Sequence, residues 1–218
     1  VMLRNRVIDM LEQAENETDP ILRNSFLTFV VVGGGFAGIE TAGELMDLLL
    51  DARKYYPTIE KGDIRVIVLE ALPMILPGFN EKLAEFSKEK MIKRGIDIRL
   101  RTAVTSFDGT EVTVKSLDEN PKDSVDESKI DVIRTKTLIW TVGVTPVNTI
   151  KRSMFKTDKG KVIVNDFLEV PEFPGVFAIG DCALFMDPQT NRPFAPTAQL
   201  AEAQAKIAAH NLNALIKN

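Results

Sequence analysis

The sequence predicts an α/β fold that is built on a parallel β-sheet. Residues 26–32 (FLTFVVV) form a continuous apolar, β-branched run, glycines follow this run at once, and residues 64–69 (IRVIVL) form a second run. Runs of this kind are typical of parallel strands that are covered on both faces. Strands that alternate with helical patterns indicate βαβ units.

The segment between the two runs predicts a helix over residues 36–54. Its apolar residues recur at helical spacing and would form the inner face. These residues are Ile39, Ala42, Met46, Leu49 and Leu50. Pro57 and Gly62 close this region before the second strand, so the elements together form one βαβ unit.

A further helix is expected to begin after Asn80, a residue type that caps helix N-termini. Gly95 stands where the chain should leave the helix. This helix carries the apolar residues Leu83, Phe86 and Ile92.

Antiparallel strands and a final strand follow this helix. Residues 96–100 alternate as a strand, and Asp108-Gly109 is a hairpin turn signal. Residues 116–130 are polar and rich in turn formers, which predicts an exposed loop, and residues 138–142 return to an apolar strand. This order describes a Rossmann-type domain with a β-meander, which we place at residues 26–145.

The remaining segments are predicted to be pieces of a second domain. Residues 1–18 have a helical apolar spacing, and we assign residues 1–25 as a flanking helical piece. Residues 146–218 contain short strand-like runs at 162–164 and 176–179, followed by an alanine-rich helix from 197 to about 217. We expect these pieces to belong to one domain whose amino-terminal part is missing from this chain.

The composition excludes several kinds of chemistry. Cys182 is the only cysteine, which excludes an internal disulfide and a CxxC redox pair, and His210 is the only histidine, which leaves no Ser-His-Asp triad and no plausible zinc site. The net charge of −4 argues against a nucleic-acid partner. No apolar run reaches the roughly 18 residues that a membrane helix needs.

A glycine-rich loop joins the first strand to the first helix. Gly33, Gly35 and Gly38 spell GxGxxG directly after a buried strand and directly before a helix. Free N–H groups at the helix N-terminus bind phosphate, so the loop predicts a dinucleotide site. We assign the whole loop to cofactor binding: Gly33, Gly34, Gly35, Phe36, Ala37 and Gly38. The motif also occurs by chance, but the flanking strands and helix favour the functional interpretation.

Glu70 ends the second strand, where dinucleotide-binding domains carry an acid for the adenosine ribose hydroxyls. It lies further from Gly38 than the usual ~20 residues, because the first helix is long and a loop around Tyr55 follows it. No arginine immediately follows Glu70, which favours NAD(H) over its 2′-phosphorylated form. The alternative is a solvated acid at a strand end.

Four segments together resemble a known family, the type II NADH:quinone oxidoreductases. They are VVVGGGFAGIETAGEL (30–45), TLIWTVGVTP (137–146), VFAIGDCA (176–183) and PTAQLAEAQA (196–205). These enzymes are flavoproteins with two dinucleotide-binding domains, relatives of the disulfide reductases. The resemblance covers nearly the whole chain, and it implies that the flanking pieces belong to an incomplete FAD-binding domain.

The resemblance also implies roles for individual residues. Asp181, with Gly180, resembles the aspartate turn at the flavin ribityl chain, and Gly143 matches the point where the chain passes the nicotinamide. Glu40 would face the junction of nicotinamide and flavin, and Gln199, beside Ala198, would flank the flavin where quinone arrives. Three simpler alternatives stay open: Asp181 as a turn residue, Gln199 as a polar helix-start residue, and Glu40 as part of a solvated acidic stripe with Glu44, Asp47 and Asp51.

The chain also departs from the family pattern. The first GxGxxG, which holds the FAD pyrophosphate, and the C-terminal amphipathic membrane segment are absent, and only Gln204 remains of the family's glutamine pair. Cys182 has no partner for sulfide chemistry, and we expect an inert thiol.

The intact protein would transfer hydride from NADH to FAD and electrons on to quinone. It would lie in the cytoplasm at the inner face of the cell membrane, attached peripherally through the missing segments, and a homodimer is compatible with the resemblance. We expect this chain alone to bind NAD(H), without FAD and without turnover. The alternatives are a ferredoxin, sulfide or disulfide reductase and a non-catalytic nucleotide-sensing module.

Overall fold

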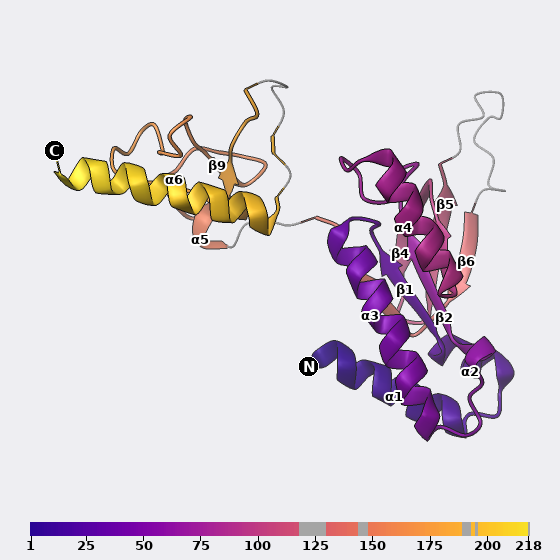
Figure 1. Cartoon of the computed structure of the whole chain (residues 1–218). Helices are drawn as coiled ribbons and strands as arrows, with labels where there is room; N and C mark the ends of the chain where they lie inside the picture. Colours follow the sequence, from indigo (N-terminus) through magenta and orange to yellow (C-terminus); the bar gives the residue numbers. More distant parts are fainter. Residues whose placement is uncertain (118–129, 144–147, 189–192, 195, 218) are drawn as a thin grey trace. The chain divides into compact units, whose positions relative to one another are not determined.

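The computed structural model describes residues 1–117, 130–143, 148–188, 193–194 and 196–217 (Figure 1). The chain forms two compact units, Val1–Val142 and Gly143–Asn218. The predicted end of the Rossmann-type domain, residue 145, is not among the described residues. The boundary between the two compact units, after Val142, falls just before it. We describe each unit by itself.

The first unit contains a four-stranded parallel sheet in the order β3-β2-β1-β7. The strands are β1 (Thr28–Val32), β2 (Arg65–Leu69), β3 (Ile96–Arg99) and β7 (Thr137–Trp140). Helix α3 (Phe36–Ala52) connects β1 to β2, and α4 (Glu81–Lys93) connects β2 to β3. Short 3₁₀ turns at Arg53–Tyr55 and Lys61–Asp63 complete the first connection. The predicted βαβ unit is therefore present.

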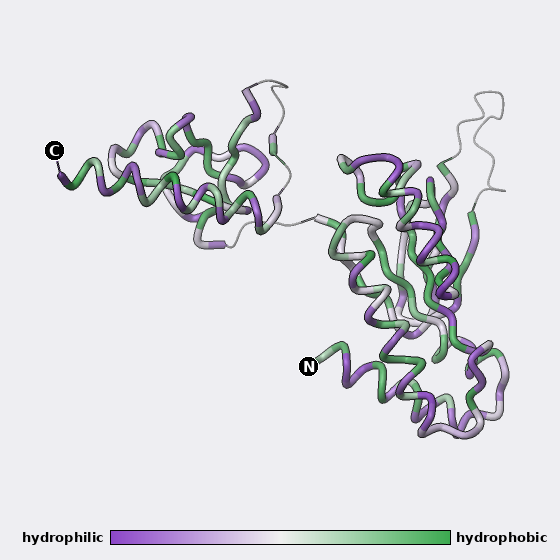
Figure 2. Tube along the Cα trace, in the orientation of Figure 1, coloured by the Kyte–Doolittle hydropathy of each residue, from purple (hydrophilic) through white to green (hydrophobic). Residues whose placement is uncertain are grey.

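Both faces of the sheet are buried, as the apolar runs predict. On one face, Phe29 and Val31 pack in a cluster with Ala42, Leu45 and Leu49 of α3. The other face packs against an antiparallel meander of β4 (Thr102–Phe107), β5 (Glu111–Ser116) and β6 (Ile130–Arg134). This second cluster contains Val30, Val32, Ile67, Leu69, Val112, Val114 and Ile133. Figure 2 shows the strongly apolar colouring of the central strands. Burial on both faces explains why β1 has no polar alternation.

The predicted hairpin turn is present between β4 and β5. Asp108 Oδ1 accepts hydrogen bonds from Thr110 N, Thr110 Oγ1 and Glu111 N, and Gly109 has a φ of +92°. These hydrogen bonds, led by the one from the Thr110 hydroxyl, lower the pKa of Asp108. The turn is therefore closed by its aspartate, as expected for this residue pair. The predicted loop at 116–130 lies mostly outside the described residues.

The amino-terminal helices pack with the first unit, which differs from the predicted assignment of residues 1–25 to a second domain. Helix α1 (Met2–Asn16) buries Val7, Met10, Leu11 and Ala14 in the cluster that covers one face of the sheet. Helix α1 ends at Asn16, and Asp19 caps α2 (Pro20–Phe26), because its Oδ1 accepts a hydrogen bond from Ile21 N at 2.8 Å. The apolar face of α1 is thus buried against the sheet domain. The domain boundaries of a longer protein stay a prediction.

Helix α4 begins as predicted. Asn80 caps it, because its Oδ1 accepts from Lys82 N and Leu83 N. Its larger apolar residues Leu83, Phe86 and Ile92 are 50%, 55% and 50% exposed. The helix instead buries Ala84 and Met91. Ala84 is a small residue, and it lets the helix lie close to Ile75 and Leu76. The larger apolar side chains of α4 therefore point outward.

The second unit is made of short elements and one long helix. They are α5 (Asn148–Lys151), β8 (Thr157–Asp158), β9 (Lys161–Ile163), the 3₁₀ turn η4 (Gly180–Cys182), β10 (Ala183–Leu184) and α6 (Ala198–Lys217). The three strands pair in the order β10-β9-β8. The predicted strand at 176–179 is reduced to a single bridge between Glu169 and Phe177. Within the described segments, no helix has the combination of length and apolar character that spanning a bilayer requires.

The packing of α1 can be tested with Leu11→Ala, which removes a fully buried side chain from the core. We expect the free energy of unfolding of the chain to fall by about 2–5 kcal/mol in denaturant titration. Leu3→Ala is the matched control on the same helix, because Leu3 is 36% exposed. Equal, small effects of both substitutions would show that α1 is not part of this core.

Candidate nucleotide-binding site

The glycine-rich loop leaves β1 in a conformation that only glycine adopts easily. Gly33 has a φ of +106°, and its N–H donates to Leu69 O at 2.8 Å. A Cβ at this position would lie 2.8 Å from Thr141 Oγ1 and 2.9 Å from Val142 Cγ2. Both the backbone conformation and the space therefore require glycine.

Gly38 brings the first turn of α3 against the end of β1. A Cβ on Gly38 would lie 1.8 Å from Gly33 O, and no shift of a flexible side chain could relieve this contact with the backbone. Thr141 Oγ1, which donates to Val32 O at 2.7 Å, fills the adjacent space. The close packing of helix on strand that the motif predicts is thus observed.

Gly35 lies at the open side of the loop. It is the N-cap of α3, no side chain caps this helix end, and an added Cβ would meet nothing within 4 Å. The next residues, Phe36 and Ala37, are exposed. The N–H groups of the first helical turn therefore face open space, which is the arrangement that binds phosphate at helix N-termini.

Glu70 lies against the loop and is 8% exposed. Its Oε2 accepts from Gly34 N at 2.5 Å, and its Oε1 accepts from Leu72 N at 2.8 Å. The alternative of a solvated strand-end acid is therefore wrong. Each carboxylate oxygen keeps lone-pair capacity for a further donor, so hydrogen bonds to ribose hydroxyls stay compatible with this arrangement.

The segment after β2 supports the loop, which sequence reasoning missed. Leu76 N donates to Gly34 O at 2.7 Å. The rings of Phe36 and Phe79 meet edge to face with centroids 5.5 Å apart. The apolar residues between Glu70 and Asn80 were the available signal, because a loop so rich in them must cover something.

Glu40 is exposed on α3 together with Glu44, Asp47 and Asp51. Asp47 pairs with Arg94 at 2.5 Å and Asp51 with Lys54 at 2.7 Å. In the part of the chain that the structure describes, the side chains of Glu40 and Glu44 make no hydrogen bond or ion pair. Glu40 is the member of this stripe nearest to the glycine loop in sequence, and its predicted role at the nicotinamide stays a prediction.

The other predicted site residues lie in the second unit. Gly143 is its first residue and has a φ of +79°. Asp181 is exposed in η4, next to Gly180 with its φ of +68°. The structure brings η4 and α6 into contact, and Ala198 and Gln199 are exposed in the first turn of α6.

Gln204 connects these two elements, a role that its sequence position did not reveal. Its side chain is 3% exposed, and its Oε1 accepts from Gly180 N at 2.7 Å. The partly buried Cys182 donates from Sγ to Ile179 O at 3.1 Å, and its expected inertness stays a prediction. The turn that carries Asp181 is thus held by α6 through one buried amide.

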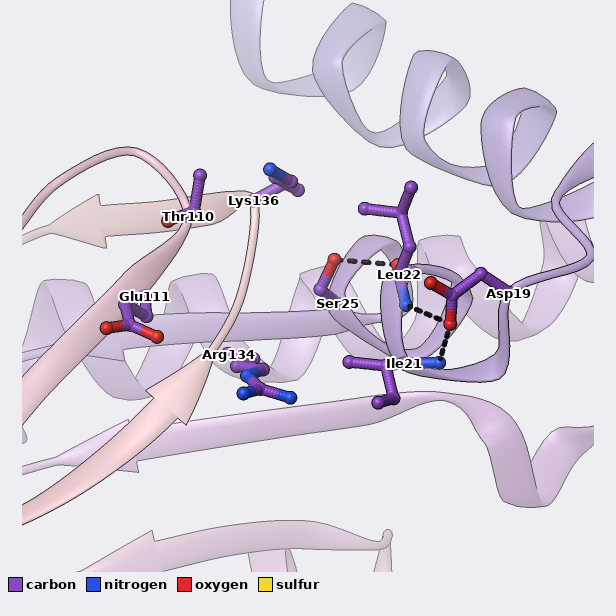
Figure 3. Close-up of a pocket in the computed structure, with 8 residues that line it drawn as sticks. All are labelled: Asp19, Ile21, Leu22, Ser25, Thr110, Glu111, Arg134 and Lys136. Atoms are coloured by element: carbon purple, nitrogen blue, oxygen red, sulfur yellow. Dashed lines mark hydrogen bonds between the residues drawn. The ribbon is translucent and has the colours of Figure 1, made fainter.

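A pocket of about 270 Å³ lies elsewhere in the first unit (Figure 3). Asp19, Ile21, Leu22 and Ser25 line it from α2 and its cap, and Thr110, Glu111, Arg134 and Lys136 line it from the meander side. Lys136 N donates to Ser25 O, which places the pocket at the amino end of β1. Ligands of open parallel sheets bind at the carboxyl ends, so this pocket does not belong to the candidate site. The described residues contain no cluster of three potential metal ligands.

The link between Gln204 and η4 can be tested with Gln204→Ala. This substitution leaves the partly buried Gly180 N–H without its acceptor, so we expect a loss of about 1–3 kcal/mol in the unfolding free energy of the second unit. Hydrogen exchange at the Gly180 amide should also accelerate. Gln199→Ala, an exposed glutamine on the same helix, is the control; equal effects would contradict the proposed link.

Solved structures share the fold of this chain. The NDH2 protein of Plasmodium falciparum in complex with NADH matches with a TM-score of 0.70 and 22% identity, over 82% of this chain and 36% of that chain. A ferredoxin reductase from Rhodopseudomonas palustris matches with a TM-score of 0.62 and 22% identity, over 85% of this chain and 41% of that chain. At such identities the likeness establishes the fold alone.

Relatives that are similar in sequence identify the family more specifically than the shared fold does. The external alternative NADH-ubiquinone oxidoreductase of Yarrowia lipolytica is 33% identical over 99% of this chain and 36% of its own length. The type II NADH:quinone oxidoreductase of Mycobacterium tuberculosis is 33% identical over 83% of this chain and 38% of its own length. The chain thus spans well under half of these relatives, and the predicted resemblance is confirmed.

The family model for pyridine nucleotide-disulphide oxidoreductases matches residues 3–205, which is nearly the whole chain. The match includes the glycine-rich loop, Glu70 and the turn that carries Asp181. The chain therefore belongs to the pyridine nucleotide-disulphide oxidoreductase family.

Proposed function

We propose that this chain binds NAD(H) at the glycine-rich loop, as the nucleotide-binding part of an FAD-dependent NADH:quinone oxidoreductase. The open space at Gly35, in front of the uncapped N-terminus of α3, carries this proposal. The pyrophosphate would accept hydrogen bonds from the N–H groups of the first helical turn.

Glu70 sets the expected preference for NADH over NADPH. Its carboxylate lies buried at the carboxyl end of β2, where the adenosine ribose of a dinucleotide is bound in this fold. A 2′-phosphate would bring a second negative charge close to this carboxylate, which raises the free energy of the complex. The nicotinamide would extend the other way, toward β7 and Gly143, since β7 flanks β1 on the opposite side.

The features of the second unit fit a flavin-binding role. The exposed carboxylate of Asp181 and the positive φ of Gly180 provide an acceptor and a close backbone approach for a polyhydroxylated chain. FAD, when bound, supplies the chemistry of hydride acceptance and of electron transfer to quinone. Glu40 would orient the nicotinamide, and Asp181 would accept hydrogen bonds from ribityl hydroxyls. Ala198 and Gln199 would line the approach of the acceptor.

The relatives' names support quinone as the acceptor in the whole protein, and we also propose peripheral attachment at the inner face of the cell membrane. The Yarrowia relative is named a mitochondrial protein, so the compartment depends on the organism. A homodimer stays a prediction. A ferredoxin, sulfide or disulfide reductase is the alternative enzyme, and a nucleotide-sensing module is the alternative without catalysis.

Gly35→Ala tests the phosphate site directly. A methyl group fits the backbone of Gly35, with φ −73° and ψ −176°, and meets no protein atom within 4 Å. It would instead occupy the space proposed for the pyrophosphate. We expect an unchanged unfolding free energy and an affinity for NADH lowered at least about tenfold in calorimetry.

Gly62→Ala is the matched control, because a Cβ at Gly62 also meets nothing within 4 Å and Gly62 lies outside the site. It should leave both quantities unchanged. Normal NADH affinity in Gly35→Ala would remove the loop from the binding site.

Catalysis by this chain alone is tested with the purified protein. We expect NADH binding without a flavin absorption band and without NADH oxidation by a soluble quinone. A stoichiometric flavin band, or quinone-dependent turnover, would overturn the proposal that this chain binds the nucleotide without turnover. Assaying the full-length protein with NADH and either a soluble quinone, ferredoxin or persulfide as acceptor distinguishes the alternative reductases.

A further inference from the structure

The peptide groups of Gly34 are held at both ends by the segment that follows β2. Gly34 N donates to Glu70 Oε2 at 2.5 Å, and Gly34 O accepts from Leu76 N at 2.7 Å. The other carboxylate oxygen, Glu70 Oε1, accepts from Leu72 N at 2.8 Å. One buried side chain therefore connects the phosphate loop to the start of the supporting segment.

We infer that Glu70 is a positioning residue that fixes the glycine-rich loop before the nucleotide binds, in addition to any contact with ribose. This inference rests on the proposed NAD(H) function and adds a second role to the same residue. A loop already held in its binding conformation loses less conformational entropy when a ligand binds. Part of the affinity for the dinucleotide would then come from Glu70 without direct contact.

The arrangement requires a carboxylate of this length. Two different backbone N–H groups point at its two oxygens, and an ionised carboxylate is an acceptor at both. A glutamine offers one oxygen and one NH₂ group, so one of the two N–H groups would face a donor in a site that is 8% exposed. An aspartate is one methylene shorter and would not reach both.

The lack of a side chain at Gly34 is part of the same contact. A Cβ on Gly34 would lie 3.1 Å from Cβ, Cγ and Oε2 of Glu70. The second glycine of the GGG run thus leaves room for the glutamate, whereas Gly35 leaves room for the ligand. Gly34→Ala is expected to displace the carboxylate and to reproduce part of the effect of changing Glu70.

The decisive experiment compares two ligands on the wild-type chain and on Glu70→Gln. The first ligand is NADH, and the second is an NADH analogue whose adenosine ribose lacks both hydroxyl groups. If Glu70 positions the loop, Glu70→Gln lowers the affinity for both ligands about tenfold or more in calorimetry, because this loss of affinity does not depend on contacts with the ribose. If Glu70 only reads the ribose, the substitution weakens NADH but leaves the analogue unchanged, and the inference is overturned.

Glutamine at position 70 could also disturb the fold, so Gly34→Ala and the double variant complete the comparison. Because both substitutions break the same contact, their effects on the affinity for the analogue should not add. Additive effects would contradict the inference. Asp108→Asn is the matched control, since Asp108 also accepts from two backbone N–H groups but lies in the distant β4–β5 turn. It should leave the affinity for both ligands unchanged.

A ligand-free measurement separates this inference from the proposed function. In ¹⁵N-labelled protein without ligand, the Gly34 and Leu72 amides donate to Glu70, so hydrogen exchange at one or both of them should be at least about tenfold faster in Glu70→Gln than in the wild type. Exchange at the Thr110 and Glu111 amides in the β4–β5 turn should stay unchanged. Equal exchange rates at Gly34 and Leu72 in the two proteins would overturn the inference, whereas a wild-type chain that shows this difference but binds no NADH would overturn only the proposed function.

Discussion

The close contact between the first turn of α3 and the end of β1 is the constraint on which the rest of the site depends. Gly38 packs so closely on Gly33 O that a single methyl group would lie 1.8 Å from it. This contact sets the direction of the helix, and the direction of the helix sets where its free N–H groups point. A wider separation would leave the same motif without a phosphate-sized opening at Gly35.

The sheet provides the rigidity that this contact needs. Its central strand β1 is buried over its full length between α3 on one face and the β4–β6 meander on the other. Interiors packed in this way do not deform continuously, so the loop starts from a fixed point at Val32. The segment after Glu70 then holds the opposite side of the loop through the Gly34 peptide.

The second unit contains a similar hydrogen bond between a turn and a buried side chain. A buried polar side chain, Gln204, holds a backbone N–H of the turn that carries Asp181. In both units a backbone turn that carries predicted site residues donates to a side chain from a neighbouring element. A backbone N–H at a turn without a ladder partner needs an acceptor of this kind. The two turns that carry predicted site residues therefore each have their own support, and they lie in two different compact units.

The sequence by itself determined the parts of this protein that depend on local pattern. Continuous apolar runs identified the doubly covered strands, the glycine spacing identified the tight loop between β1 and α3, and Asn80 and Asp108 identified a helix start and a turn. Each of these signals acts within a few residues along the chain, so no distant partner was needed to interpret it.

Only the tertiary structure decided which partner each surface meets. Helix α4 is one example, because Leu83 and Phe86 are apolar but exposed, whereas the small residue Ala84 is the one that packs in the cluster with Ile75 and Leu76. The packing of α1 on the sheet domain and the two backbone contacts of Glu70 likewise join residues far apart in sequence. Helical spacing shows that an apolar face exists, but the element that buries it is set by the free energy of the whole packed core.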